Sequence, residues 1–117
     1  MTALTQCKTG EYLDSSDTAY KTAKAIIDEM ASIARGLGHD IEDDYLTSLI
    51  ERPVIRENGG IYSSMYGDAK AQRPMEVDLI LSTPLRYARQ LGLNTPVLET
   101  CRSLLVAMNW RFQNQKA

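Results

Sequence analysis

The feature that most constrains this chain is a long run of helical periodicity between about Ser16 and Leu37. Apolar residues recur there at steps of three and four, which is the spacing of one face of an α-helix. Asp14, Ser15 and Ser16 are candidates for the N-cap, and Gly36 ends the run. The residues of this apolar face are Ala19, Ala23, Ile26, Ile27, Met30, Ile33, Ala34 and Leu37.

The rest of the chain repeats this pattern in shorter segments. No segment alternates apolar and polar residues with a period of two, as a half-buried strand would. We therefore predict an all-α fold, a multi-helix bundle with short loops in a single domain over residues 1–117. Further helices are expected over about 41–52, 61–72, 75–91 and 95–112.

Proline and glycine mark the ends of these helices. Pro53 should end or kink the second helix, and Pro84 should loosen a turn inside the fourth. Gly92 is placed as the residue after a helix C-terminus. Thr95 is expected to cap the last helix, with Pro96 at its first position.

Composition excludes several classes of protein. The chain has 44% hydrophobic and 24% charged residues and a net charge of −2, as in ordinary globular proteins. Its Lys and Arg residues are scattered, so we expect no nucleic-acid partner. No run approaches the ~20 apolar residues that cross a bilayer, and no signal peptide precedes the first helix, so we expect no membrane partner and a cytoplasmic location. Cys7 and Cys101 are expected to be reduced, with a disulfide as the alternative.

Common site motifs are missing or incomplete. Gly36 and Gly38 close a helix instead of opening one, which argues against a dinucleotide fingerprint. The acidic residues of 40–44 lack the spacing of a calcium loop, and His39 is the only histidine, so we expect no metal site. Gly59 and Gly60 before two serines could form an anion-binding nest or a plain turn with a helix cap.

Trp110 lies off the apolar stripe of the last predicted helix, between Asn109 and Arg111. Tryptophan is enriched at protein interfaces, so Trp110 is a candidate for a dimer or domain contact. Partial burial at the end of the chain is the alternative.

Two blocks carry a family resemblance. The sequences SSMYGD at 63–68 and RPMEVD at 73–78 resemble the signature SSMxxD followed by RxTEID of the ketopantoate reductase family. Other segments follow the family's order and spacing, and so the resemblance spans nearly the whole chain. These segments are TAL at 2–4, GEYL at 10–13, the stretch from Glu29 to Gly38, and ARQLGLNTP at 88–96.

The resemblance implies a fold and an activity. Members of this family reduce 2-dehydropantoate to pantoate with NADPH, using a Rossmann domain and a helical C-terminal domain that closes over the substrate. By the same resemblance Ser64 contacts the substrate and Glu76 contacts the cofactor. The structural alternatives are that Ser64 only caps a helix and that Glu76 only occupies a first helical turn. Asp68 is expected to be structural and to pair with Arg73.

The chain also departs from the family pattern. The family's general-acid lysine and two substrate asparagines lie on a helix before the TAL stretch, where this chain begins. A further family asparagine is Thr9 here, which we retain as a substrate-binding candidate although a hydroxyl cannot offer both sides of an amide. The family's Asn-Gly in the long helix becomes Leu81-Ser82.

These matches and departures predict a catalytically incomplete chain. We expect the substrate-side and dimerisation domain of a ketopantoate-reductase-like oxidoreductase, with a 2-oxo acid substrate, a homo-oligomeric state and a Rossmann domain supplied in cis or in trans. NADPH is expected to serve the complete enzyme and not to bind this chain tightly alone. The alternative is a stand-alone helical binding or interaction module that keeps the fold without the chemistry.

Overall fold

The computed structural model describes residues 1–114, and in this part of the chain every regular element is helical. The prediction of an all-α fold is therefore confirmed. In chain order the elements are α1 (Thr2–Thr5), α2 (Thr9–Asp14), α3 (Asp17–Gly36), α4 (Asp43–Glu51), α5 (Pro53–Arg56), η1 (Glu57–Gly59), α6 (Ser64–Lys70), η2 (Asp78–Ser82), α7 (Thr83–Gln90) and α8 (Pro96–Asn114).

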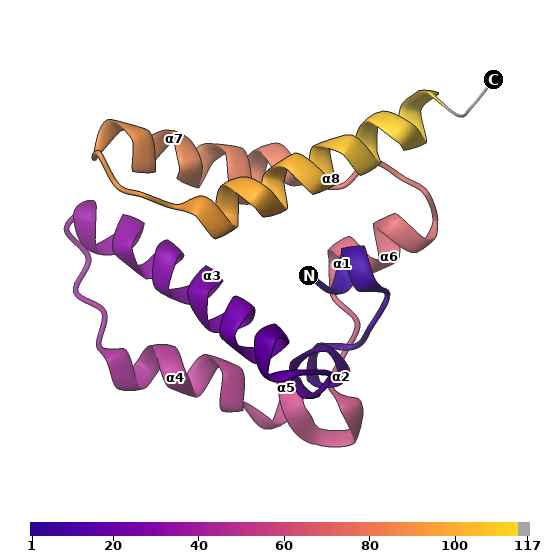
Figure 1. Ribbon diagram of the computed structural model, residues 1–117, viewed down its shortest axis with the longest axis horizontal. Helices are drawn as coiled ribbons and strands as arrows, with labels where there is room; N and C mark the ends of the chain where they lie inside the picture. Colours follow the sequence, from indigo (N-terminus) through magenta and orange to yellow (C-terminus); the bar gives the residue numbers. More distant parts are fainter. Residues whose placement is uncertain (115–117) are drawn as a thin grey trace.

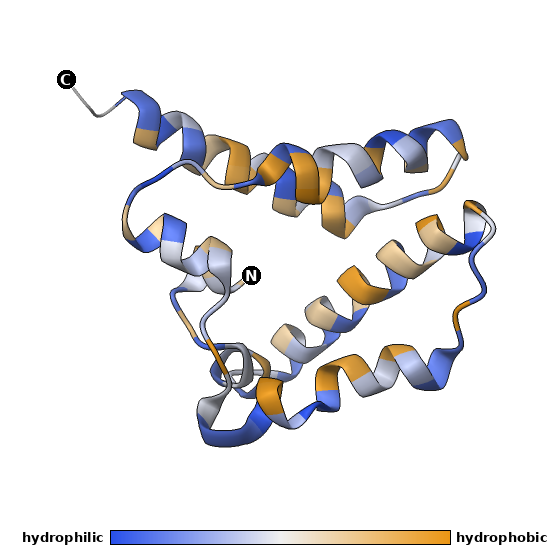
Figure 2. Cartoon of the chain, turned by 180° about the vertical axis from the view of Figure 1, so that it is seen from behind, coloured by the Kyte–Doolittle hydropathy of each residue, from blue (hydrophilic) through white to orange (hydrophobic). Residues whose placement is uncertain are grey.

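Helix α3 forms the centre of the bundle (Figure 1). Helix α4 packs on one side of it, and α7 and α8 pack on the other. The short helices α1, α2, α5 and α6 gather around its N-terminal end, so segments from both halves of the sequence meet there. The apolar residues of α4 lie along the side that faces α3 (Figure 2).

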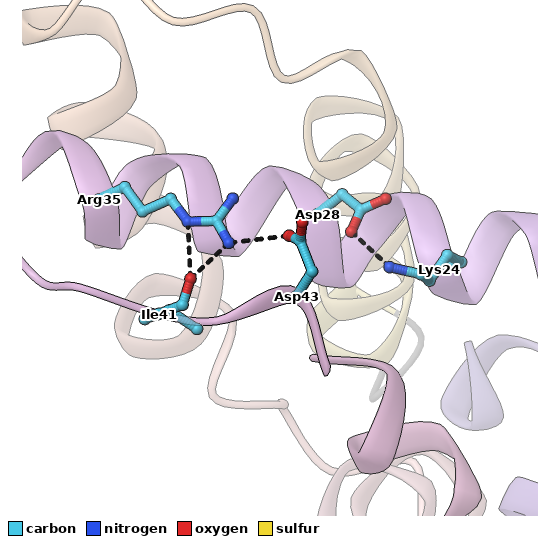
Figure 3. Close-up of polar contacts among 5 residues, drawn as sticks. All are labelled: Lys24, Asp28, Arg35, Ile41 and Asp43. Carbon is cyan, nitrogen blue, oxygen red and sulfur yellow. Dashed lines mark hydrogen bonds and ion pairs between the residues drawn. The ribbon is translucent and has the colours of Figure 1, made fainter. Parts of the chain in front are cut away.

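The predicted ends of α3 are confirmed to within one residue. The Ser16 side chain accepts a hydrogen bond from the Ala19 N–H at 2.9 Å, so Ser16 is the N-cap. Asp17 in the first turn and Arg35 in the last turn both complement the helix dipole. The Arg35 guanidinium also donates to the Ile41 carbonyl and pairs with Asp43 at 3.0 Å, which fixes the loop between α3 and α4 (Figure 3).

Proline acts at both predicted positions. Pro53 ends α4 and starts the single turn of α5. Before Pro84 the chain forms a π-helical turn, η2, in which the Thr83 N–H reaches the Asp78 carbonyl five residues back. Proline has no N–H, and its ring clashes with a normal helical turn before it, so the wider turn relieves that clash. The expected loosened turn is confirmed.

The start of α8 corrects one prediction. Pro96 occupies the first helical position as expected, but the Thr95 hydroxyl is buried and has no hydrogen-bond partner among the described residues. Instead, the carboxylate of Glu29 on α3 accepts from the Val97 N–H at 3.0 Å and the Leu98 N–H at 2.8 Å. Glu29 caps this helix because its two oxygens reach both free N–H groups at once.

Two apolar clusters hold the bundle together. The larger cluster joins α1, α3, α6, η2, α7 and α8, and includes Leu85 and Leu98, each at most 2% exposed. The smaller cluster joins α2, α3 and α4 around Tyr12, Leu13 and Ile50. Met1 packs against both clusters, so the N-terminal segment connects the two halves of the core.

Candidate functional site

An apolar groove lies where α1, α2, α3, α4 and α5 meet. It has a volume of about 250 Å³, and its walls are mainly aliphatic. Thr2 and Thr9 are the hydroxyl-bearing residues of this lining apart from Tyr12. The predicted site residue Thr9 is thus part of the wall of this groove. The aliphatic side chains of the lining include Ile26, Ile27, Leu49, Ile50 and Ile55.

Thr9 joins α2 to the segment before α6. Its backbone N–H donates to the Ile61 carbonyl at 2.9 Å, and its hydroxyl accepts from the Ile61 N–H at 3.1 Å. The same hydroxyl donates to the Ile55 carbonyl at 2.9 Å. A threonine hydroxyl has one proton, so this proton is already used within the fold. Thr9 can still accept a hydrogen bond, but it can donate one to a ligand only by releasing Ile55.

The glycines beside Thr9 are required by close packing. A Cβ on Gly60 would lie 2.2 Å from the Thr9 hydroxyl oxygen, and one on Gly10 would lie 2.9 Å from the Ile55 carbonyl oxygen. Gly59 and Gly60 have φ values of 80° and 88°, which residues with side chains rarely adopt. The N–H of Gly60 donates to the Glu57 carbonyl. This geometry favours a plain turn over the anion-binding nest at Gly59 and Gly60.

Ser63, and not Ser64, caps α6. The Ser63 hydroxyl oxygen accepts from the Tyr66 N–H at 3.1 Å and lies 2.7 Å from the Thr2 hydroxyl oxygen. The structural alternative for Ser64, that of a helix cap, is therefore wrong. Ser64 is the first residue of α6 and is exposed. Because Thr9 holds Ile61, and Ser64 follows three residues later, the fold brings Thr9 and Ser64 to the same region.

Two stacked tyrosines lie beside this region. The rings of Tyr62 and Tyr66 are 4.2 Å apart between centroids, and the planes differ by 16°. Lys8, next to Thr9, has its ammonium group 5.4 Å from the Tyr62 ring, and that of Lys70 lies 5.9 Å from the Tyr66 ring. These contacts place positive charge beside the start of α6.

Glu76 lies just before η2, and its side chain is exposed. Its carbonyl accepts from the Ile80 N–H at 3.2 Å, so it stands immediately ahead of the first turn and not inside it. Asn109 on α8 fixes the preceding residue, since its amide accepts from the Met75 N–H at 2.8 Å and donates to the Met75 carbonyl at 3.1 Å. No hydrogen bond among residues 1–114 joins the side chain of Glu76 to Thr9 or Ser64.

The sequence did not reveal the roles of Asn109 and Glu29. Both are half-buried polar residues on long helices, with exposed residues beside them, and nothing in the local sequence pattern distinguishes them. Each satisfies backbone groups of a segment distant in sequence. The expected pair of Asp68 and Arg73 is confirmed at 3.2 Å.

The remaining candidates take no part in this region. His39 lies exposed in the loop after α3, and the described residues contain no group of three or more His, Cys, Asp or Glu side chains able to hold a metal ion. Cys7 and Cys101 are free thiols, and burial raises the pKa of Cys101 above its ordinary value. Within residues 1–114, no helix is long and apolar enough to cross a membrane.

Fold and site together define an all-helical domain with a groove and a polar, serine-bearing segment at one end. Residues 1–109 match the family described as "Ketopantoate reductase PanE/ApbA C terminal", and the chain belongs to this family. The fold is also that of a solved ketopantoate reductase from Staphylococcus aureus, described as dimeric, with a TM-score of 0.80 and 23% identity. That match covers 95% of this chain and 38% of the S. aureus chain.

Curated relatives agree with this assignment. The chain is 33% identical over 96 residues to the 2-dehydropantoate 2-reductase of Salmonella typhimurium, covering 82% of this chain and 30% of that protein. It is 35% identical over 92 residues to the meiotically up-regulated gene 72 protein of Schizosaccharomyces pombe, covering 78% of this chain and 16% of that protein. The chain thus spans less than a third of the length of these relatives.

Proposed function

We propose that this chain is the substrate-side domain of an NADPH-dependent oxidoreductase that reduces a 2-oxo acid, with 2-dehydropantoate as the first candidate. A Rossmann domain in cis or in trans completes the enzyme. Membership of the family and the name of the Salmonella relative support the activity. The bridge from Thr9 to Ile61, which holds the start of α6 beside the groove, is the structural observation that carries the proposal.

Ser64 is proposed to bind the substrate. Its exposed hydroxyl can donate to a carboxylate or carbonyl oxygen of a 2-oxo acid. The ammonium group of Lys8 lies over the neighbouring Tyr62 ring and favours an anionic substrate in this region. Thr9 holds the loop in place, and its remaining lone pair can accept from a hydroxyl group of the substrate.

Glu76 is proposed to bind the cofactor. An exposed carboxylate can accept hydrogen bonds from ribose hydroxyls, and this fits a nucleotide that approaches from a second domain. The cofactor supplies a hydride when it is bound. The roles proposed for Ser64 and Glu76 are those of positioning groups, which hold the substrate and the cofactor in place.

A domain exchange tests this function. The region of the Salmonella enzyme that matches this chain would be replaced by the 117 residues, and NADPH oxidation with 2-dehydropantoate would be followed by absorbance. We expect turnover by the hybrid and none by the isolated chain. Ser64→Ala should raise KM, and Glu76→Gln should weaken NADPH binding, each by about tenfold, as expected for the loss of roughly 1.4 kcal/mol.

Glu99→Gln is the matched control for Glu76→Gln, because Glu99 is also exposed but lies on α8. Its kinetic constants should equal those of the unchanged hybrid. A hybrid that folds and binds NADPH but does not turn over would refute the proposal. That result would favour the alternative, a stand-alone interaction module, which the use of the Thr9 proton within the fold also supports.

We also propose that the chain self-associates. The S. aureus ketopantoate reductase that shares its fold is described as dimeric. Several large apolar side chains of this chain are exposed, among them Leu79 at 71% and Trp110 at 65%. Exposed apolar groups of this size favour a protein contact.

A further inference from the structure

Glu76 stands at the corner of a three-residue turn. The Val77 N–H donates to the Met75 carbonyl at 2.8 Å, two residues back, so Glu76 is the central residue of a γ-turn. Met75 is 5% exposed and Val77 is 3% exposed, whereas the side chain of Glu76 is exposed. The two buried neighbours anchor the turn in the core and leave Glu76 at the surface.

Asn109 on α8 binds this turn through its side-chain amide. The amide oxygen accepts from the Met75 N–H at 2.8 Å, and the amide nitrogen donates to the Met75 carbonyl at 3.1 Å. The same carbonyl also accepts from Val77, so both of its lone pairs are used. Every backbone hydrogen-bonding group of Met75 therefore has a partner, and the residue next to Glu76 is fixed in orientation.

This amide is the polar anchor of the connection between α6 and η2, residues 71–77. Among the described residues, the other hydrogen bonds of this segment run back to α6, within the segment itself or forward to η2. Burial of the Met75 side chain holds the segment against the core. It is the hydrogen bonds of Asn109 that set how the backbone is turned at this point.

A second contact from α8 holds the chain on the other side of Glu76. Arg102 precedes Asn109 by two helical turns, so both lie on the same side of α8. The Arg102 Nε donates to the Ser82 hydroxyl at 2.8 Å, and that hydroxyl donates to the Asp78 carboxylate at 3.0 Å. Asp78, Arg102 and Asn109 line one groove, of about 260 Å³, so the two contacts lie side by side.

We propose that Asn109 is a positioning residue for the cofactor, which acts on NADPH through the placement of the Glu76 carboxylate and does not touch the cofactor itself. This inference rests on the cofactor role proposed above for Glu76 and adds the residue that sets its geometry. A carboxylate on a fixed turn loses less entropy when a nucleotide binds than one on a free loop. A hydrogen bond to a ribose hydroxyl is also lost when the acceptor moves by about 1 Å.

The test uses the hybrid enzyme of the domain exchange, with the Kd of NADPH measured by its fluorescence. Asn109→Ala keeps the Glu76 carboxylate but releases the turn. It should therefore weaken NADPH binding by about three- to fivefold, less than the roughly tenfold effect of removing the charge in Glu76→Gln. The KM for 2-dehydropantoate should stay unchanged, because Ser64 lies on α6. A general loss of structure would alter both constants.

A double variant shows whether Asn109 acts through Glu76. Added to Glu76→Ala, Asn109→Ala should change the Kd of NADPH by less than about 1.5-fold, because no carboxylate remains to be placed. Asn109→Gln keeps the amide on a side chain that is one methylene longer, so it should displace the turn and also weaken binding. This variant serves the same purpose where Asn109→Ala does not fold, as judged by circular dichroism.

Glu29→Ala is the matched control. Glu29 also binds two backbone groups of a distant segment, the N–H groups of Val97 and Leu98, but at the other end of α8. Its loss should lower stability and leave the Kd of NADPH unchanged.

The outcomes separate this inference from the proposed function. If Glu76→Ala leaves NADPH binding unchanged, the cofactor role of Glu76 and the positioning role of Asn109 are both wrong. If Glu76→Ala weakens binding but every folded Asn109 variant binds NADPH like the unchanged hybrid, the positioning role alone is wrong. The same conclusion follows if Asn109→Ala has its full effect in the Glu76→Ala background, or raises both constants equally. Turnover of the unchanged hybrid tests the reductase activity independently.

Discussion

Glu29 should contribute to stability through the start of α8. Because Pro96 has no N–H and the Glu99 N–H donates to the Thr95 carbonyl, the free donors of the first turn are Val97 and Leu98. Both donate to the Glu29 carboxylate. Hydrogen bonds to a charged group contribute roughly 1.5–3 kcal/mol each, and because Glu29 is only half-buried we take the low end, about 3 kcal/mol for the pair.

Thr95 should reduce the loss when Glu29 is replaced. Its hydroxyl has no partner in the described structure and stands at the N-cap position, where a threonine accepts from the third residue of the helix, Leu98. In Glu29→Ala this hydroxyl becomes free to take over that N–H, which restores about 1 kcal/mol. We therefore expect Glu29→Ala to lower the free energy of unfolding by about 2 kcal/mol, or the Tm by roughly 6–10 °C for a domain of this size.

A double-mutant cycle measures how far Thr95 takes over the capping role of Glu29. Thr95→Val alone removes a hydroxyl that makes no hydrogen bond, so it should be nearly neutral. Glu29→Ala combined with Thr95→Val should cost about 3 kcal/mol, which is about 1 kcal/mol more than the sum of the single changes. The assay is urea unfolding with an unchanged m value. If the loss in the double variant equals the sum of the losses in the two single variants to within about 0.3 kcal/mol, which is on the order of the additivity error, Thr95 does not replace Glu29 as the cap of α8.

Three further predictions concern stability and reactivity. Gly60→Ala should destabilise the fold by about 3 kcal/mol or more, because the added Cβ overlaps the Thr9 oxygen and because alanine rarely adopts a φ of 88°. Thermal unfolding measures the loss. Gly38→Ala is the control, since Gly38 also has a positive φ but a Cβ there meets no neighbouring atom within 4 Å. Asn109→Ala should cost about 2 kcal/mol because it leaves the Met75 N–H without a partner and removes one of the two hydrogen bonds that the Met75 carbonyl accepts, and urea unfolding measures the loss. Burial raises the pKa of Cys101, so this thiol should react with a maleimide far more slowly in the native protein than in a denatured control. The pKa of the same thiol in the unfolded chain is lower. Its contribution to the free energy of unfolding is therefore complete below about pH 9 and declines as the pH rises above that value. Equal reaction rates in native and denatured protein, or a midpoint of unfolding that does not fall at alkaline pH, would contradict the last prediction.

Local rules predicted most of the helical architecture. Ser16, Pro53, Pro84, Pro96 and Gly92 act where the sequence placed them, because caps, missing N–H groups and positive φ angles depend only on neighbouring residues. The helix expected over 61–72 is shorter, Ser64–Lys70, and the one expected from Met75 starts later. Both differences arise at ends where tertiary contacts to α1 and α8 decide the start.

Contacts between distant segments were not predictable in this way. The cap of α8 comes from Glu29, which lies 68 residues before Val97, and Met75 is held by Asn109 from 34 residues away. A periodicity argument identifies a buried face but not which polar side chain on another helix will satisfy an exposed backbone group. Ser64 and Glu76 were chosen as site candidates from the resemblance to the family alone. The geometry of the structure shows only that Ser63, the residue before Ser64, is the N-cap of α6.

Thr9 provides the sharpest test of whether this end of the domain binds substrate. Its hydroxyl performs two tasks within the fold, accepting from Ile61 and donating to Ile55, so it has no proton left for a 2-oxo acid. An asparagine has two N–H donors and a carbonyl, which is enough for both tasks with one donor to spare. In the hybrid enzyme, Thr9→Asn should therefore lower KM for 2-dehydropantoate by about three- to tenfold, since one added hydrogen bond contributes roughly 0.5–1.5 kcal/mol.

Gly60 already lies close to the Thr9 oxygen, so the longer side chain of Thr9→Asn has little room. If this side chain fits beside Gly60, the free energy of unfolding of the isolated chain should stay the same or rise. Thermal unfolding separates the two effects: a loss of stability with no change in KM means that residue 9 serves the fold alone. Thr9→Ser is the matched control, because it keeps the hydroxyl and its single proton and should leave KM unchanged. An unchanged KM in a stable Thr9→Asn hybrid would remove residue 9 from the proposed substrate site and leave Ser64 as its remaining contact from this end of the domain.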